Sequence, residues 1–254
     1  MNSPDGASAD ARPLRGRARE AQSNDGAILR AAREVFSEWG WGAPMSEIAS
    51  RARTGVASIY RRYPSKVELV NAIRVLSLEE ICALAEGCAD ADEGGGAEGA
   101  ASAPAESVVG RFLRRQVLEA PGSRMPTFGQ YVGTTPEIDA LSDRLHDALA
   151  ALVAIDQRRG VLPRDFGPAD VMLTVSHLRP VYAIPRARSN ELHLRHLESV
   201  LAGLRSRAAG EPVPGGARPE ELGAPTSWDE WVRLNNVDGR PSVETPERRA
   251  GAPA

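Results

Sequence analysis

Apolar residues recur at helical spacing along most of the 254-residue chain, and short polar or glycine-rich stretches separate the helical segments. The first segment spans about residues 24–39 and ends at Gly40, because glycine readily terminates a helix. Two short segments follow at about 44–52 and 56–63, and Pro64 ends the second. The first segment carries one apolar stripe, made of Ile28, Leu29, Ala32, Val35 and Phe36.

A long helix is predicted to begin at Ser65 and to run to about Ala89. Ser65 and Glu68 have the spacing of a capping box, in which each residue satisfies free backbone groups at the helix start. Residues 90–104 are rich in glycine and alanine and predict a loop. Further helical segments are predicted at about 105–120, 127–133, 136–159, 168–184 and 190–208. The run Thr135-Pro136-Glu137 is a strong helix start, with a cap, a proline and an acid in the first turn.

These patterns predict an all-α protein. Alanine, leucine and arginine are abundant, while aromatic residues make up only 5% of the chain, which favours helices over sheets. A three-helix domain is expected at 23–67 and a larger helical domain at 68–208. Residues 1–22 are interpreted as a disordered basic arm, and 209–254 as a Pro/Gly-rich tail. Within this tail, "SWDEWVRLNN" predicts a short helix that lays Trp228 and Trp231 on the larger domain.

The two short helices near residues 44–63 have the arrangement of a helix-turn-helix, which points to DNA. Small side chains at Ala57 and Ser58 would let the second helix approach the major groove, and Arg61 could read guanine. Lys66 lies in the first turn of the next helix, where backbone N–H groups attract phosphate. The candidate DNA-binding residues are Ser46, Val56, Ala57, Ser58, Tyr60, Arg61, Arg62 and Lys66.

Each of these residues also has a purely structural interpretation. Tyr60 could be a core aromatic residue with its hydroxyl at the surface, and Arg61 and Arg62 could be solvated charges. The charge distribution favours a nucleic-acid role. Residues 1–75 carry 12 Lys and Arg against 8 Asp and Glu, a net charge of +4, whereas the remainder carries −7. A basic N-terminal domain on an acidic body suggests that only the former meets a polyanion.

The segment "ILRAAREVFSEWGWGAPMSEIASRARTGVASIYRRYPSKVELVNAI", residues 28–73, resembles the DNA-binding domain of the TetR family of transcriptional regulators. The matching positions are Phe36, Gly40, Ile48-Ala49, Ala52, Ala57-Ser58-Ile59-Tyr60 and Tyr63-Pro64-Ser65-Lys66. One departure lies at the turn, where Arg53 and Thr54 replace the glycine and aliphatic residue that are usual in the family. A left-handed backbone would cost an arginine roughly 1–2 kcal/mol relative to glycine, so the turn could be reshaped with the help of Gly55.

The resemblance implies a helical C-terminal domain that binds a small molecule and dimerises through its last two long helices. The predicted protein is a sequence-specific regulator, a repressor released from a palindromic operator by its ligand. Ligand binding would tilt the long helix that starts at Ser65 and change the separation of the two DNA-reading helices. The candidate ligand-binding residues are Phe112, Gln116, Met125, Phe128, Tyr131, His146 and His177, although most could be ordinary core residues.

Three other interpretations remain open at this stage. The protein could be a DNA-binding regulator without a small-molecule effector. It could also be a helical ligand-binding protein or an enzyme, although none of the common catalytic motifs occurs in the chain. His193 and His196 have the spacing of a shared metal site but lack an evident third ligand, so we expect no metal and no cofactor.

The cellular context follows from weaker signals. Cys82 and Cys88 are expected to be free thiols, since on one helix they point in different directions. The sequence shows neither a secretory signal nor an apolar run long enough to cross a bilayer. We therefore expect a soluble, cytoplasmic protein.

Overall fold

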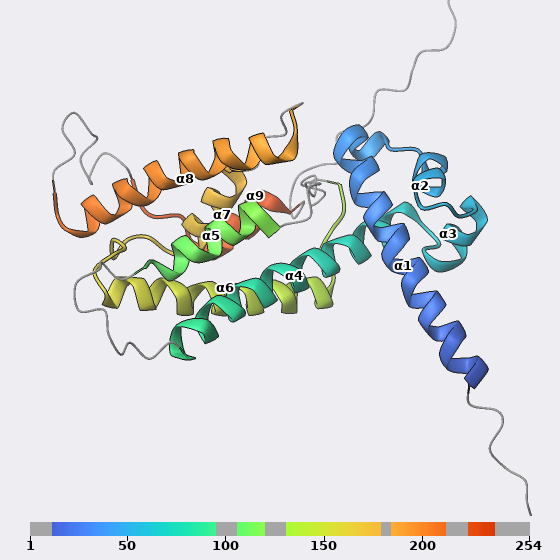
Figure 1. Ribbon diagram of the computed structural model, residues 1–254, viewed down its shortest axis with the longest axis horizontal. Coiled ribbons are helices and arrows are strands. Elements are labelled where there is room, and N and C mark those ends of the chain that lie inside the picture. Colours follow the sequence, from blue (N-terminus) through green and yellow to red (C-terminus); the bar gives the residue numbers. More distant parts are fainter. Residues whose placement is uncertain (1–11, 95–105, 120–130, 179–183, 212–222, 237–254) are drawn as a thin grey trace, which may run out of the picture.

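The computed structural model describes residues 12–94, 106–119, 131–178, 184–211 and 223–236, and the side chains of residues 12–24 and 93–94 are not described (Figure 1). All of the regular structure in these ranges is helical, which confirms the all-α prediction. The elements are α1 (Arg12–Trp39), the 3-10 turn η1 (Gly40–Gly42), α2 (Met45–Arg51), α3 (Val56–Arg62), α4 (Lys66–Gly94), α5 (Val108–Glu119), α6 (Pro136–Arg158), α7 (Pro168–His177), α8 (Arg186–Ala208) and α9 (Trp228–Asn235).

Helices α1, α2 and α3 form a compact head at one end of the molecule, and α4 leads from it into an elongated helical body (Figure 1). The head encloses its own core, in which Phe36 of α1, Ile48 of α2 and Ile59 of α3 are completely buried. Tyr63 packs against the same core. The first turn of α4 therefore extends directly from a packed three-helix unit.

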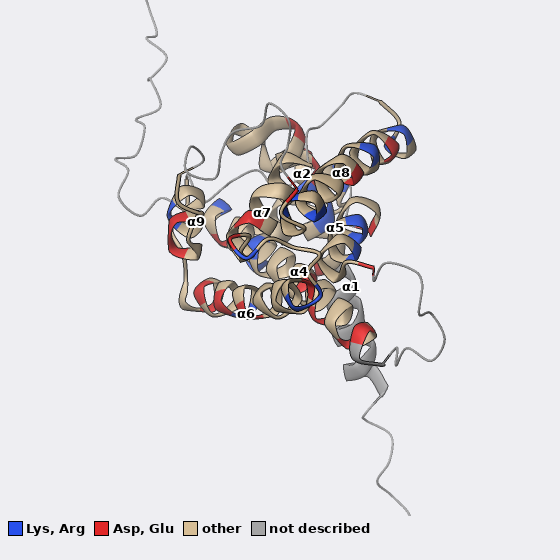
Figure 2. Cartoon of the chain, turned by 90° about the vertical axis from the view of Figure 1, so that its left-hand side faces the viewer, with Lys and Arg blue, Asp and Glu red and all other residues tan. Residues whose placement is uncertain are grey.

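The body has a second core, to which α4, α5, α6, α7 and α8 all contribute. Helices α4 and α6 lie alongside each other and make the most extensive contact in the molecule, and α5 packs against both. Basic and acidic residues are interspersed along the helices of the body (Figure 2). Several of them form ion pairs between helices, such as Arg114 with Glu198 at 2.7 Å and Arg144 with Glu86 at 2.6 Å.

Helix α9 confirms the prediction for the tail. Trp228 and Trp231 stack on each other with ring centroids 4.8 Å apart, and both pack against the core of the body. Ser227 caps this helix by accepting a hydrogen bond from the backbone N–H of Glu230. The C-terminal tail is thus tied to the body by one short amphipathic helix.

Some of the predicted boundaries differ from the structure. Helix α1 begins at Arg12, earlier than the expected start near Asn24, so residues 12–22 are helical and only 1–11 of the predicted arm lie outside the described residues. The segment predicted at 168–184 ends as a helix at His177. Of the segment predicted at 127–133, only residues 131–133 are described, and these are not helical.

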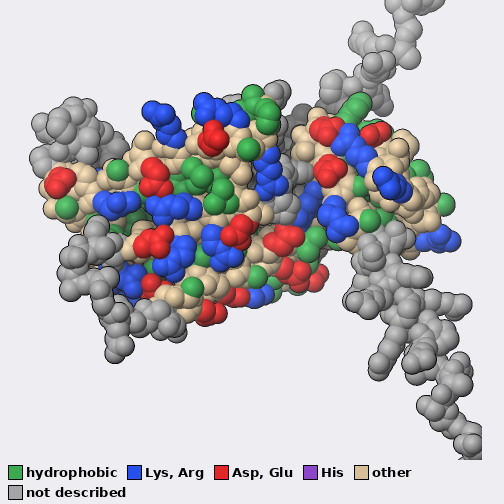
Figure 3. Space-filling view, viewed as in Figure 1, with side chains coloured by type: hydrophobic (Ala, Val, Ile, Leu, Met, Phe, Trp, Pro, Cys, Tyr) green, Lys and Arg blue, Asp and Glu red, His purple; other side chains and the backbone are tan. Residues whose placement is uncertain are grey.

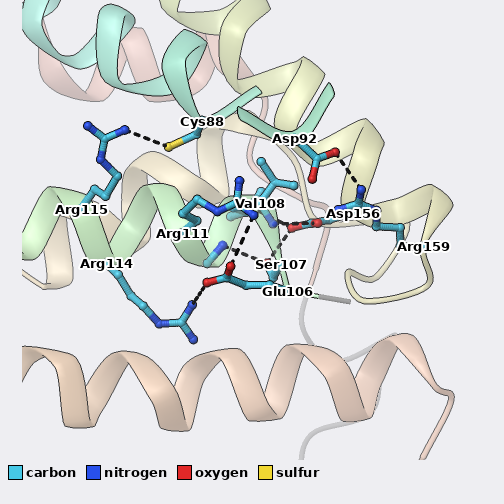
Figure 4. Close-up of polar contacts among 12 residues, drawn as sticks. Cys88, Asp92, Glu106, Ser107, Val108, Arg111, Arg114, Arg115, Asp156 and Arg159 are labelled. Atoms are coloured by element: carbon cyan, nitrogen blue, oxygen red, sulfur yellow. Dashed lines mark hydrogen bonds and ion pairs between the residues drawn. The ribbon is translucent and has the colours of Figure 1, made fainter. Parts of the chain in front are cut away.

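The start of α5 is capped by a buried carboxylate from another helix (Figure 4). Asp156 of α6 is fully buried and accepts hydrogen bonds from the Ser107 hydroxyl at 2.6 Å and from the N–H groups of Val108 and Val109 at 2.9 Å. The Ser107 Oγ in turn accepts from the N–H of Gly110 at 2.8 Å. Free N–H groups at a helix start favour an anion, so Asp156 fixes where α5 sits on α6.

Two further expectations concern the cysteines and membrane-spanning helices. Cys82 and Cys88 are both buried and free, as predicted, and burial raises the pKa of the Cys82 thiol to about 11. Among the helices that the structure describes, none is both long enough and apolar enough to cross a membrane.

Candidate nucleic-acid interface

Helix α3 turns one face into the head and the other to solvent. Ile59 on the inner face is completely buried, whereas Val56, Ala57, Tyr60 and Arg61 on the outer face are exposed. Tyr60 has 44% of its surface exposed, so its ring is not a core residue, which was the alternative left open by the sequence. Val56 and Tyr60 are four residues apart, as are Ala57 and Arg61, so these residues form a single strip on the helix.

The predicted base-reading pair lies on the edge of this strip. The Arg61 guanidinium donates a hydrogen bond from Nη2 to the Ser58 Oγ at 2.8 Å, one turn earlier on the same helix. Ser46 is exposed in the first turn of α2. The structure therefore brings Ser58 and Arg61 together and leaves Ser46 accessible on the neighbouring helix.

The turn between α2 and α3 sets the angle at which α3 is presented. Arg53 adopts a left-handed backbone with φ of 52°, the only non-glycine residue in the described ranges with positive φ. Its N–H donates to the Ser50 carbonyl at 3.1 Å, and the N–H of Thr54 donates to the Ala49 carbonyl at 3.0 Å. This pair of bonds is a Schellman motif, in which glycine usually occupies the left-handed position. Gly55, with φ of −80°, does not take over that position, so the turn keeps its geometry and Arg53 bears the strain.

Arg62, one of the predicted DNA-binding residues, has a partner within the head. Its guanidinium forms an ion pair with Asp25 of α1 and lies beside Tyr63. Burial raises the pKa of the Tyr63 hydroxyl, and the positive charge of Arg62 partly opposes this shift. Arg62 is thus directed along the head toward α1 and links the end of α3 to that helix.

Lys66, the residue predicted to contact phosphate, makes its hydrogen bonds within the head. Its ammonium group donates hydrogen bonds to the carbonyl oxygens of Trp41 and Ala43, the latter at 2.8 Å, and it lies 5.5 Å from the centre of the Phe36 ring. Partial burial lowers the pKa of Lys66. Carbonyl groups near the end of a helix lack intrahelical donors and accept hydrogen bonds from a nearby cation.

Arg51 is a residue that the sequence analysis did not single out. Its guanidinium makes two hydrogen bonds to the Glu38 carboxylate, both at 2.6 Å, and a third to Glu47 at 3.0 Å. The hydrogen bonds from Arg51 lower the pKa of Glu38, and the same bonds raise the pKa of Arg51. This forked contact holds α2 against α1. The Glu47–Arg51 spacing of four residues on one helix was the available sequence signal.

The structure describes five of the seven predicted ligand-binding residues, and they lie in different parts of the molecule. Phe112 and Gln116 are buried in the body, His146 lies against Trp228 with ring centroids 5.2 Å apart, and His177 is exposed at the end of α7. Tyr131 is also exposed and stacks on Trp41 of the head, with ring centroids 5.3 Å apart. Met125 and Phe128 lie outside the described residues.

An open groove of about 740 Å³ lies where the head meets the body. Leu29 of α1, one side of α4 and the first residues of α6 line it, and none of the seven predicted residues is among its lining. Near it, two contacts tie head and body together. Arg33 of α1 is buried and pairs with Glu80 of α4 at 2.9 Å, and Arg74 of α4 donates to the Gly133 carbonyl at 2.9 Å.

The histidines form no evident metal centre. Within the described ranges, no group of three or more His, Cys, Asp or Glu side chains is placed to hold a metal ion.

Comparison with known proteins agrees with this geometry. A family model for bacterial regulatory proteins of the tetR family matches residues 28–73, which contain the helix-turn-helix. The chain is similar to the crystal structure of a TetR transcription regulatory protein from Mycobacterium vanbaalenii, with 24% identity, a TM-score of 0.50, and coverage of 76% of this chain and 99% of that one. It is also similar to the TetR family transcriptional regulator PfmR from Thermus thermophilus, with 20% identity, a TM-score of 0.46, and coverage of 68% and 93%. Comparison with curated proteins gave no match. Residues 28–73 are therefore similar to the DNA-binding domain of bacterial regulatory proteins of the tetR family.

Proposed function

We propose that the protein is a repressor that binds a palindromic DNA operator as a homodimer and is released by a small-molecule ligand. The observation that carries this proposal is the exposed face of α3, where small, aromatic and basic side chains stand together over a rigid three-helix core. One short helix reads few base pairs. Two such helices on a two-fold axis would read half-sites about one helical turn (~34–36 Å) apart.

On this proposal, α3 enters the major groove with Val56, Ala57 and Tyr60 facing the DNA. Ala57 allows close approach of the backbone, and the Tyr60 hydroxyl reaches a phosphate. Arg61 exchanges its bond to Ser58 for the acceptor edge of guanine, and the freed Ser58 hydroxyl contacts a base or phosphate. Ser46 contacts the opposite phosphate strand. Arg62 and Lys66 then act mainly within the head.

Release requires that the ligand favour a conformation in which the two recognition helices no longer fit the operator. Helix α4 is the element that can transmit this change, because both cores depend on it. Its first turns supply Leu69, Val70 and Ile73 to the head, and later turns supply Cys82 and Cys88 to the body. A tilt of α4 relative to α6 would therefore move the whole head rather than deform it.

The test is DNA selection with the purified full-length protein, followed by affinity measurement over a range of salt concentrations. A specific dimer gives one enriched palindrome and a steep fall of affinity with salt. We expect Arg61→Ala to relax the preference at one base position of each half-site, at a cost of about 1–3 kcal/mol. Arg164→Ala removes an equal charge from an exposed site on the body and should leave binding unchanged. Failure to enrich any sequence, or equal effects of the two changes, would refute the proposal.

A further inference from the structure

The groove between head and body has the composition of a binding site. Six residues of α4 line it at spacings of three, four, seven, eight and eleven, which places them on one side of the helix: Glu68, Asn71, Ala72, Val75, Leu76 and Glu79. Leu29 of α1 closes one side, and Thr135, Pro136 and Glu137 at the start of α6 close another. The floor is apolar in the middle and carries carboxylates toward the ends.

The charged side chains that line this groove are all negative. Glu68, Glu79 and Glu137 contribute three exposed carboxylates, and no lysine or arginine is among the described lining residues. None of the three carboxylates forms an ion pair with another described residue. Acidic side chains gather along the edge of the body that approaches the head (Figure 3). The Oδ1 atom of Asn71 is buried and accepts no hydrogen bond from the described part of the chain.

We infer that this groove binds a small organic cation with an apolar body. The inference rests on the proposed function, because it supplies the chemical class of the releasing ligand and its position. A volume of about 740 Å³ is in the range of drug-sized sites. The apolar floor accepts a hydrocarbon or aromatic group, while three carboxylates that form no ion pair with another described residue attract and orient a positive charge.

The nearby start of α6 does not reverse this preference. A helix start attracts anions through its free N–H groups, but Thr135 already accepts the N–H of Ile138 at 3.3 Å. Glu137 and Asp139 place two negative charges in the same turn. An anionic ligand would therefore meet repulsion from the carboxylates of α4 and of α6.

The position of the groove explains how a bound cation would change the affinity for DNA. Leu29 belongs to the head, Glu137 belongs to the body, and α4 joins them. A cation that contacts all three favours one arrangement of head on body, and its affinity depends on that arrangement. DNA affinity and cation affinity must then change by the same factor.

The test compares two ions of matched shape and opposite charge, tetraphenylphosphonium and tetraphenylborate, by equilibrium dialysis against the full-length protein. We expect the cation to bind and the anion not to bind. Saturating cation should weaken operator affinity, with the cation's effect on free DNA measured separately. Equal binding of both ions, or no binding of the cation at millimolar concentration, overturns the inference.

Variants assign the binding to the groove. Glu68→Gln, Glu79→Gln and Glu137→Gln keep the side-chain shape, and each should weaken cation binding about two- to fivefold. Glu230→Gln on α9 removes the same charge far from the groove and should have no effect. Ala72→Phe fills the apolar floor and should block the cation without changing the charge. If the triple glutamine variant binds the cation as well as the unmodified protein does, the groove is not the site.

The two proposals fail in different ways. If the protein selects an operator but neither ion changes its DNA affinity, the inference on the cation fails and the DNA-binding function stands. If the cation binds in the groove but no operator is selected, the function fails instead.

Discussion

The strained turn between α2 and α3 gives the sharpest test of how this head is built. Arg53 adopts a left-handed backbone in a position where the Schellman motif favours glycine. The left-handed conformation costs a residue with a Cβ atom roughly 1–2 kcal/mol. Arg53→Gly removes this cost, but glycine also loses more freedom on folding, which takes back about 0.4–1 kcal/mol. The expected net gain in the free energy of unfolding is about 0.5–1 kcal/mol.

The Arg53 side chain itself contributes little to the free energy of unfolding. Arg53 is exposed, and its side chain makes no hydrogen bond or ion pair with another described residue, so its removal leaves neither a cavity nor an unpaired group. For a protein of this size, the gain corresponds to a rise in Tm of about 1–4 °C. Urea unfolding followed by circular dichroism measures the same quantity through the shift of the midpoint.

Arg53→Ala is the matched control, because alanine loses the charge but keeps the Cβ atom. If the backbone is the cause, alanine leaves stability unchanged and asparagine, which tolerates this conformation better, gives a partial gain. An equal gain from alanine and glycine would show that charge repulsion was relieved instead. A loss of stability in Arg53→Gly would refute the assignment of the turn. The salt dependence of operator binding shows whether Arg53 also contacts DNA. If Arg53→Gly loses a phosphate contact, the slope of log affinity against log salt concentration falls by about 0.9 per site.

Three further predictions follow from buried polar groups. Asp156→Ala should lower the free energy of unfolding by about 3 kcal/mol in urea titration, because three donors at the start of α5 lose a buried charged acceptor. Asp156→Asn should cost less, and equal costs for the two variants would contradict a role for the charge. Lys66→Met should destabilise the head by about 1–3 kcal/mol and leave the salt slope of DNA binding unchanged, whereas a slope reduced by about 0.9 would restore the phosphate contact first predicted. Burial raises the pKa of Cys82 from 9.0 to about 11, so the folded chain holds a proton that the unfolded chain releases, and stability should fall as pH rises through this window. Urea unfolding at about pH 8 and about pH 10 should show a shallower loss for Cys82→Ala, and an identical loss would contradict this assignment.

Sequence periodicity was sufficient for most of the head. The observed bounds of α2 and α3 lie within a residue or so of the predicted ones, since short amphipathic segments between glycine and proline leave few alternatives. The cap at Thr135 is confirmed by its hydrogen bond to the N–H of Ile138, and Ser65 accepts the N–H of Glu68 as predicted. These features depend on neighbouring residues alone, which is why the sequence reveals them.

The hydrogen-bond and ion-pair partners of long basic side chains could not be predicted from the local sequence. Lys66 and Arg62 lie beside residues that are distant in sequence, the carbonyls after α1 and the carboxylate of Asp25. A lysine or arginine can reach several partners within its length, and tertiary packing decides among them. The same limit applies to the proposed ligand site, because the groove combines three helices and its lining residues had no distinguishing motif.

The head is also less independent than a boundary at residue 67 suggests. Its core includes Leu69, Val70 and Ile73 from α4 and Val132 from the segment before α6, all at most 5% exposed. Burial of each such side chain contributes about 1.5–3 kcal/mol, so a fragment that ends at residue 67 would lack much of the stability of a small domain. Val132 is held in place by Arg74, which donates to its carbonyl at 3.3 Å and also to Asn236 of the tail at 2.7 Å. Because the head needs residues from α4 and from the segment before α6 to complete its core, a change in the packing of the body would reach the core against which α3 packs.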